Sequence, residues 1–221
     1  MNNKLPITLG ISGHRDLRAE DREILRKSVR QIIQFIRQHY PNNPLELLSP
    51  LAEGADILVA QVALEEKVRL IAPLPLPLHL YEMDFGNQEI QETFSELLKQ
   101  AEVIELPLLD SEENLSNYGE ARNLQYVQVG AYVAKNSDIL IALWDGLPLE
   151  KAGGTSQVVK FMLTGDMMDL PKEYQNSETG AVCQIVTPRK SGKALKNVGE
   201  IRVLGDKKCK YLRNFDKRSL P

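Results

Sequence analysis

Short apolar runs alternate along this chain with longer stretches in which apolar residues recur every three or four positions. The most apolar run, residues 139–143, contains no charge, as expected of a parallel strand covered on both faces. Residues 17–40 have apolar side chains at helical spacing with charged residues between them, which predicts a long amphipathic helix. The two patterns follow one another through most of the sequence, so strands and helices are expected to alternate.

The same patterns divide the rest of the chain into elements. The predicted strands are residues 7–11, 47–51, 68–72, 102–108, 139–143 and 181–187, with an edge hairpin near 200–204. The predicted helices are residues 17–40, a helix that follows 53–56, residues 89–100 and 122–135, and a helix that opens at 153–155, with loops at 110–119 and 165–180. Right-handed crossovers between such strands predict an α/β fold, a doubly wound and mainly parallel Rossmann-like sheet with helices on both faces and a short C-terminal edge hairpin.

Prolines occupy alternate positions in residues 73–77, directly after a predicted strand. Proline cannot donate a hydrogen bond to a neighbouring strand, and this spacing forces an extended, non-helical backbone. We expect this stiff segment to line one wall of a cleft. Tyr81 and Asp84 follow it, and they either close over a ligand or belong to a loop.

Small-residue turns end three of the predicted strands, after residues 7–11, 47–51 and 139–143, and each leads toward a helical pattern. In an open parallel sheet such turns lie together at the carboxyl ends of the strands. Glycine lets backbone N–H groups approach a ligand there, and helix N-termini favour anions. The sequence therefore predicts a nucleotide-type site that is assembled from several loops.

The first turn offers a candidate phosphate site. Ser12 and the N–H groups of Gly13 and His14 are candidates to bind phosphate, and Arg15 is a candidate bidentate partner. The alternative is structural. In that interpretation Ser12 is a turn or cap residue, and His14 and Arg15 are exposed loop side chains.

The second turn offers two carboxylates beside a glycine. Glu53, Gly54 and Asp56 are candidates for ligand binding, because either carboxylate can accept hydrogen bonds from ribose hydroxyls. If the protein is an enzyme, Glu53 and Asp56 are the candidate catalytic residues, acting as a general acid or base. Asp56 is equally compatible with a first-turn acid that interacts with the helix macrodipole.

The third turn contains Trp144, Asp145 and Gly146. The indole of Trp144 is a candidate to stack on a nucleobase, with Asp145 accepting a hydrogen bond from a hydroxyl or an exocyclic amine. Alternatively, Trp144 only packs at the rim of the site.

Consecutive glycines and a hydroxyl follow the third turn, at Gly153, Gly154 and Thr155. At a helix start these residues are typical of a phosphate-binding nest. The structural alternative is that Thr155 is only the N-cap of the helix.

Composition supports one domain with its own core, because the 221 residues are 43% hydrophobic. No apolar run approaches the roughly 20 residues that span a bilayer, and the N-terminus has no signal-peptide core, so we expect a soluble, cytoplasmic protein. Cys183 and Cys209 are far apart and form no metal-binding motif. They are expected to be reduced thiols. A nucleotide ligand is expected, and the use of a metal stays open, because the sequence shows no constellation of metal ligands.

Charge is distributed unevenly, although the net charge is only −3. Residues 188–221 hold eleven Lys or Arg and three acidic residues, so this segment carries +8 and the remainder −11. An acidic body argues against a broad nucleic-acid-binding surface, which relies on neutralising phosphates. The basic segment is either a solvated extension or a contact for RNA, an anionic membrane or another domain.

These motifs, taken in order with the turn at 12–15 first and the glycines at 153–154 last, resemble the SLOG superfamily. That superfamily contains Rossmann-like domains related to the LOG phosphoribohydrolases and to the DprA/Smf DNA-processing proteins. Similar domains occur in bacterial signalling and conflict proteins and at the N-termini of melastatin-type TRP channels. The resemblance implies a nucleotide-binding domain at residues 1–187, followed by a basic extension at 188–221 with an edge strand or hairpin.

One departure from the LOG pattern bears on activity. LOG enzymes resemble one another in a Pro-Gly-Gly-x-Gly-Thr-x-x-Glu loop, whose glutamate assists cleavage of an N-glycosidic bond. In this chain Val158 stands where that glutamate would fall. The resemblance therefore favours a sensor of a phosphate-containing nucleotide or an ADP-ribose-like ligand over the alternative of a LOG-like N-glycosidase. A third hypothesis, a DprA-like single-strand DNA binder, is disfavoured by the acidic body. We also expect a homo-oligomer and a membrane or effector segment beyond the basic ending.

Overall fold

The computed structural model describes residues 4–148, 153–166, 179–205 and 212. In this part of the chain, strands form one seven-stranded sheet in the order β4-β3-β2-β1-β5-β6-β7. Their bounds are Ile7–Gly13 (β1), Leu45–Leu48 (β2), Arg69–Leu74 (β3), Glu102–Glu105 (β4), Ile139–Trp144 (β5), Ala181–Val186 (β6) and Ile201–Leu204 (β7). All neighbouring pairs are parallel except β6 and β7. The expected α/β sheet with an antiparallel hairpin at its edge is confirmed.

The direction of chain winding reverses in the middle of the sheet. From β1 the chain builds outward through β2 and β3 to β4, and it then continues on the other side of β1 with β5 and β6. β1 and β5 stay paired up to Gly13 and Leu143, so the two loops that follow these strands leave the sheet side by side. In open α/β sheets, ligands bind outside the carboxyl ends of the strands at such a switch point.

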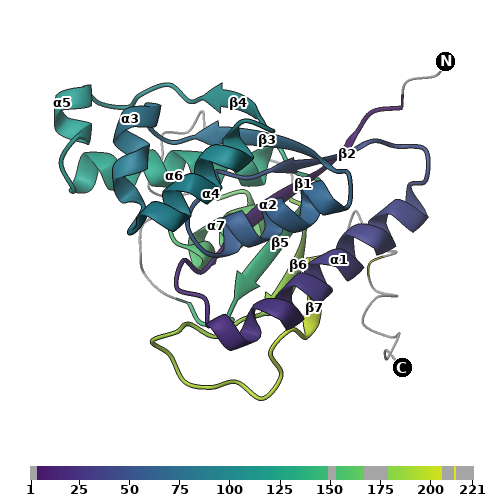
Figure 1. The fold of residues 1–221 in the computed structure, drawn as a ribbon. Helices are drawn as coiled ribbons and strands as arrows, with labels where there is room; N and C mark the ends of the chain where they lie inside the picture. Colours follow the sequence, from purple (N-terminus) through teal and green to yellow (C-terminus); the bar gives the residue numbers. More distant parts are fainter. Residues whose placement is uncertain (1–3, 149–152, 167–178, 206–211, 213–221) are drawn as a thin grey trace.

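Helices cover both faces of the sheet (Figure 1). On one face, α2 packs against both α1 and α4, and on the other face α6 packs against α7. The bounds are Arg22–His39 (α1), Ala55–Glu65 (α2), Gln88–Leu98 (α4), Glu120–Lys135 (α6) and Thr155–Thr164 (α7).

Strand β5 shows how the sheet separates two cores. Its side chains alternate between the faces, so Ile141 and Leu143 join the core beneath α1 and α2, whereas Leu140 and Ala142 join the core beneath α6 and α7. These four residues are fully buried. This explains why the strand is apolar at successive positions rather than at every second one.

The long predicted helix is confirmed, with a different start. Residues Ala19–Asp21 form a 3₁₀ turn, η1, and α1 begins at Arg22. Its apolar face is buried, and Arg30 on its polar face pairs with Glu65 of α2 and with Glu66, the C-cap of α2. Ion pairs at the surface therefore join two helices that already share a core.

Short helical turns were not predicted from the sequence. They are α3 (Leu78–Tyr81), η2 (Glu82–Asp84) and α5 (Glu112–Leu115), each too short to show an apolar period. Strand β2 ends at Leu48, ahead of Ser49 and Pro50, and β4 ends at Glu105, whereas the predicted strands ran to residues 51 and 108. These two predicted strands were too long, whereas β3 continues past the predicted end at residue 72, through Pro73 to Leu74.

The C-terminal segment contributes to the fold where it is described. β7 pairs antiparallel with β6, and Leu212 is 1% exposed in the main core. The boundary between a domain at 1–187 and an extension at 188–221 stays a prediction. Among the described residues, no helix is both long and apolar enough to cross a lipid bilayer.

Candidate functional site

The loops after β1 and β5 are joined through His14. Its backbone N–H donates to the carbonyl of Leu143 (3.0 Å), and the N–H of Asp145 donates to its Nε2 (3.2 Å). Because Nε2 accepts this hydrogen bond, the neutral ring carries its proton on Nδ1. His14 is 2% exposed, and its buried Nδ1 has no hydrogen-bond partner.

The charges around His14 act on its pKa in opposite directions. Burial lowers the pKa below the usual 6.5, and the nearby Arg189 guanidinium lowers it further. The carboxylates of Asp145, whose Oδ2 lies 3.5 Å from Nε2, and of Asp16 oppose this effect. His14 is therefore not the exposed loop residue of the structural alternative, but a neutral, buried group between the two loops.

Glycines bring the loops after β1 and β2 into close contact. A Cβ at Gly13 would lie 2.4 Å from the Cβ of Ala55, and a Cβ at Gly54 would lie 2.2 Å from the carbonyl oxygen of Arg15. Gly54 also has a φ of +88°, which only glycine adopts readily. Backbone packing accounts for both glycines, and their ligand-binding roles stay predictions.

Asp56 is a buried acid at the start of α2, with 7% of its surface exposed. Burial raises its pKa to about 7, against the opposing effect of the Arg15 charge and of a hydrogen bond from the N–H of Ala52 (3.4 Å). Glu53 is only partly buried. The two predicted carboxylates therefore differ in environment. Asp56 is buried with a raised pKa, whereas Glu53 is in contact with solvent.

Tyr126 of α6 connects the first turn to the glycine turn before α7. The Arg15 guanidinium lies over its ring, 5.2 Å from the ring centroid. A Cβ at Gly153 would lie 3.1 Å from the backbone and Cβ of the same tyrosine. The two segments predicted to bind phosphate, far apart in sequence, thus both contact Tyr126, one at its ring and the other at its backbone and Cβ. The buried hydroxyl of Tyr126 has no hydrogen-bond partner.

The glycine turn itself is ordered by contacts within the turn. Gly153 has a φ of +68°, and its N–H donates to Oε1 of Gln157 (2.7 Å). Gly154 is the N-cap of α7, without a side-chain cap hydrogen bond. The alternative in which Thr155 is the N-cap is therefore wrong, because Thr155 is already the first residue of the helix. Gly154 itself has no side chain that could cap the helix.

Trp144 lies in β5 rather than in the loop after it. Its side chain packs in the core beneath α6 and α7 with 9% exposed, and its Nε1 donates to the carbonyl of Leu147 (3.1 Å). Asp145 accepts a hydrogen bond from the N–H of Leu147 (3.0 Å), and Gly146 has a φ of +85°. Stacking of a base on Trp144 stays a prediction, and most of the indole is covered by protein.

Tyr81 and Asp84 are held inside the protein. The Tyr81 hydroxyl donates to the carbonyl of Pro50 (3.0 Å), and burial raises its pKa well above the usual range. Asp84 forms a buried ion pair with Arg122 (2.8 Å). These contacts fasten α3 and η2 to the loop after β2 and to α6, so the two side chains are packed inside the protein instead of closing over a ligand.

Arg189 and Asp16 are site residues that the sequence analysis missed. Arg189 lies between two carboxylates, with Nε 3.8 Å from Asp145 Oδ2 and Nη1 3.8 Å from Asp16 Oδ1. Arg189 follows the end of β6 by three residues. The rule used for the other strands, that turns at carboxyl ends share one edge, would have found it.

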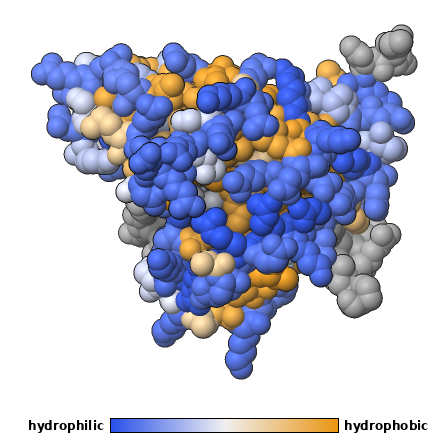
Figure 2. Space-filling view, in the orientation of Figure 1, coloured by the Kyte–Doolittle hydropathy of each residue, from blue (hydrophilic) through white to orange (hydrophobic). Residues whose placement is uncertain are grey.

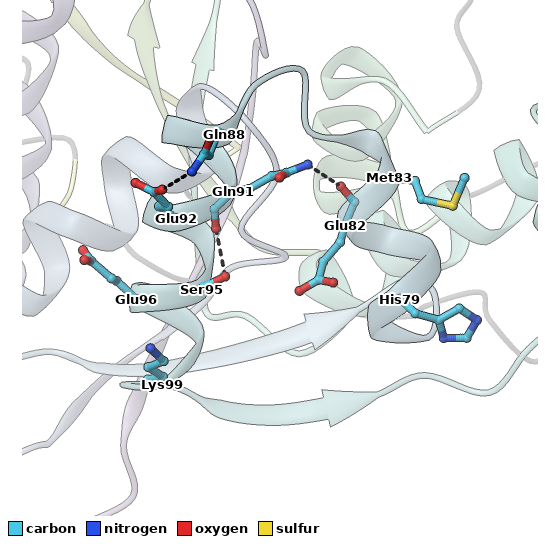
Figure 3. A pocket seen from close by; sticks show the side chains of 9 residues that line it. All are labelled: His79, Glu82, Met83, Gln88, Gln91, Glu92, Ser95, Glu96 and Lys99. Carbon is cyan, nitrogen blue, oxygen red and sulfur yellow. Dashed lines mark hydrogen bonds between the residues drawn. The ribbon is translucent and has the colours of Figure 1, made fainter.

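A surface hollow of about 600 Å³ lies elsewhere, between α4 and the α3–η2 segment (Figure 3). Its lining includes Glu82, Glu92 and Glu96, together with His79 and Lys99. None of the residues proposed for nucleotide binding lines it. Its acidic lining is also unsuited to phosphate.

Comparison with known proteins shows a likeness in structure only. No protein-family model matches the sequence, and no curated protein sequence matches it. The fold is similar to that of DNA processing protein A (DprA) from Streptococcus pneumoniae, with a TM-score of 0.44 and 11% identity over 69% of this chain and 45% of that chain. It is also similar to DprA from Helicobacter pylori, with a TM-score of 0.44 and 16% identity over 79% of this chain and 69% of that chain. The chain thus spans less than half the length of the S. pneumoniae protein.

These likenesses concern the fold alone. The likeness to conflict proteins and to melastatin-type channels stays a prediction.

One expectation about partners is corrected. The H. pylori DprA is described as having a single-stranded DNA binding mode, which contradicts the exclusion of a nucleic-acid surface drawn from the acidic body of this chain. The exclusion was wrong because net charge averages over the whole surface, whereas binding depends on one face. At the carboxyl ends of the strands, Arg15 and Arg18 lie in one loop, and the loop that carries Arg189 is hydrogen-bonded to it.

Proposed function

We propose that this chain is a nucleotide-binding module that holds a phosphate-containing nucleotide, or an ADP-ribose-like ligand, at the carboxyl ends of β1, β2 and β5. The observation that carries the proposal is the meeting of Arg15 and Gly153 at Tyr126. One segment supplies a cation, and the other supplies the N-terminus of α7, the positive end of the helix dipole. Both favour an anion at the same place.

Arg15 has the freedom to bind an anion. Among the described residues it makes no ion pair within 4 Å, and its contact with the face of Tyr126 leaves the guanidinium edge available. Ser12, Gly13 and His14 precede it at the end of β1. In this proposal Arg15 and the start of α7 hold the phosphate, while Glu53 and Asp145 are candidates for the ribose or base.

Binding without turnover is the form of this function that we favour over the LOG-like N-glycosidase. Val158 occupies the position of the LOG glutamate, and it is 2% exposed. It faces α6, since a Cβ on Gly130 would lie 2.8 Å from its Cγ2. A carboxylate in that place would point into the helix interface and away from the ligand.

A charge reversal in the glycine turn tests the proposal. Gly154 has φ −74° and ψ 158°, values that other residues adopt, so Gly154→Glu is expected to fold. Its carboxylate would repel phosphate at the helix start, and binding of nucleotides measured by calorimetry should be abolished. For the wild type, a nucleotide at a hundred times its dissociation constant should add about 2.7 kcal/mol of stability in a thermal-shift screen.

Gly154→Ala is the matched control, because it adds a side chain without charge. We expect it to retain most of the affinity. Undiminished binding by a folded Gly154→Glu protein would show that the phosphate does not lie at α7.

A further inference from the structure

The guanidinium of Arg189 has unused hydrogen-bonding capacity at the edge of the proposed site. Its two carboxylate neighbours both lie 3.8 Å away, beyond the 2.7–3.2 Å range of a hydrogen bond. Its Nε is buried without a hydrogen-bond partner. A guanidinium has five N–H donors, and among the described residues none of those of Arg189 donates a hydrogen bond.

The backbone of Arg189 is fixed, in contrast to its unused side chain. Its carbonyl accepts hydrogen bonds from Nε of Arg18 (3.1 Å) and from the N–H of Gly192 (3.0 Å). The next residue, Lys190, donates its N–H to the carbonyl of Asp16 (2.8 Å). The loop between β6 and β7 is thereby fastened to the loop after β1, beside the start of α1 (Figure 1).

This fastening places a second cation on the other side of the β1 loop from the first. Arg15 lies over Tyr126, on the side of α6, whereas Arg189 lies beside Asp145 and Asp16, on the side of the β5 and β6 loops. In Figure 2 the lower end of the molecule, where the β6–β7 loop projects, shows hydrophilic residues interspersed with hydrophobic ones. An anion has access to Arg189, because one third of its side chain is exposed.

We infer that Arg189 forms a second anion subsite, which takes the further phosphate of a nucleotide that carries two or more. This inference rests on the proposed function, because the first phosphate is the one at Arg15 and α7. In this structure, Asp145 and Asp16 hold the guanidinium in place at long range. On binding, the guanidinium exchanges these for two short, parallel N–H···O contacts to phosphate, which are stronger than its present ones.

His14 fits this arrangement because it is neutral. A protonated imidazole at this position would compete with Arg189 for Asp145, whose Oδ2 lies 3.5 Å from Nε2. Arg189 and burial both lower the pKa of His14, so the imidazole bridges the two loops without adding charge. The carboxylates that face the pair are Asp145 from the β5 loop and Asp16 from the β1 loop.

The test compares the four ribonucleoside diphosphates with the four monophosphates by calorimetry on the full chain. We expect Arg189→Ala to lower the affinity for the diphosphate that binds best by about 10- to 100-fold, and to change the affinity for its monophosphate by less than about threefold. Arg189→Lys keeps the charge but loses the fork geometry. Its affinity for the diphosphate should therefore lie between that of the wild type and that of Arg189→Ala. Lys190→Ala is the matched control, because it removes one exposed positive charge from the neighbouring position.

Three outcomes would overturn the inference. Equal losses of diphosphate affinity in Arg189→Ala and Lys190→Ala would show that only the overall positive charge of the loop matters. Equal losses for diphosphate and monophosphate would place Arg189 at the first phosphate. Tighter binding of a dT12 oligonucleotide than of any diphosphate would assign the cation to a nucleic-acid backbone. If the wild type binds no nucleotide at all, the proposed function itself fails, which is a different result; unchanged melting temperatures confirm that the variants fold.

Discussion

Asp56 shows how burial can make one acid dominate the pH dependence of stability. Its pKa is about 7 in the folded protein and 3.8 in an unfolded chain. The folded state therefore binds more protons than the unfolded state between about pH 4 and pH 7. The contribution of Asp56 to the free energy of unfolding is fully present below pH 4 and is lost as the pH rises through 7.

Asp56→Asn removes this loss, because the amide stays uncharged at every pH. We expect the variant to be more stable than the wild type at pH 8 by about 2 kcal/mol. This is about half of the free energy that the whole pKa shift would correspond to at roughly 1.4 kcal/mol per pKa unit. At pH 4 the two proteins should be similar. Urea unfolding at both pH values measures the difference, and Asp166→Asn, an exposed acid after α7, is the control. An equal effect of Asp56→Asn at pH 4 and pH 8 would contradict the assignment.

At the scale of elements, the contact between α2 and the loop after β1 decides whether the site forms. The N-cap of α2 is Gly54, and the N–H of Ala55 donates to the carbonyl of His14 (3.0 Å). The same loop presents Arg15 to Tyr126. Any displacement of α2 is thus passed to the cation that we assign to the phosphate.

Gly54→Ala should break this contact. The added methyl group would lie 2.2 Å from the carbonyl oxygen of Arg15, on a backbone with φ +88°. We expect the free energy of unfolding to fall by about 3 kcal/mol. Gly86→Ala is the control, since the nearest atom to its Cβ is Glu53 Oε2 at 3.9 Å, and it should change stability by less than about 0.5 kcal/mol. Similar stability of both variants under urea unfolding would refute the packing role of Gly54.

At the scale of the whole molecule, the proposed site contains two acidic side chains, Glu53 and Asp56, that could catalyse cleavage of a bound nucleotide. We predict that they do not. Incubation with AMP, NAD or ADP-ribose is expected to release no base or ribose above background, measured by chromatography. The physical reason is that the LOG glutamate is replaced by a buried valine, and that Asp56 is almost fully covered. Turnover that disappears in Glu53→Gln would instead establish the N-glycosidase.

The sequence alone was sufficient for the strands, the main helices and the loops of the site. Apolar residues at successive positions in β5 and at helical spacing in α1 are local signals of burial. Short turns such as α3 and α5 leave no such signal. The strand ends at Leu48 and Glu105 depend on which neighbour is available for hydrogen bonding, which the local sequence does not show.

The tertiary structure decided which of the predicted residues meet. Sequence spacing did not show that neighbouring protein atoms occupy the space beside Gly13 and Gly54. It also did not show that Trp144 packs in a core, or that Arg189 lies near His14, more than 170 residues away in sequence. Such pairings are set by the order of strands in the sheet and by the space that each glycine leaves, and both are properties of the packed molecule. Residue types at strand ends therefore determined the kind of ligand to expect, whereas the switch point between β1 and β5 determined which cations face it.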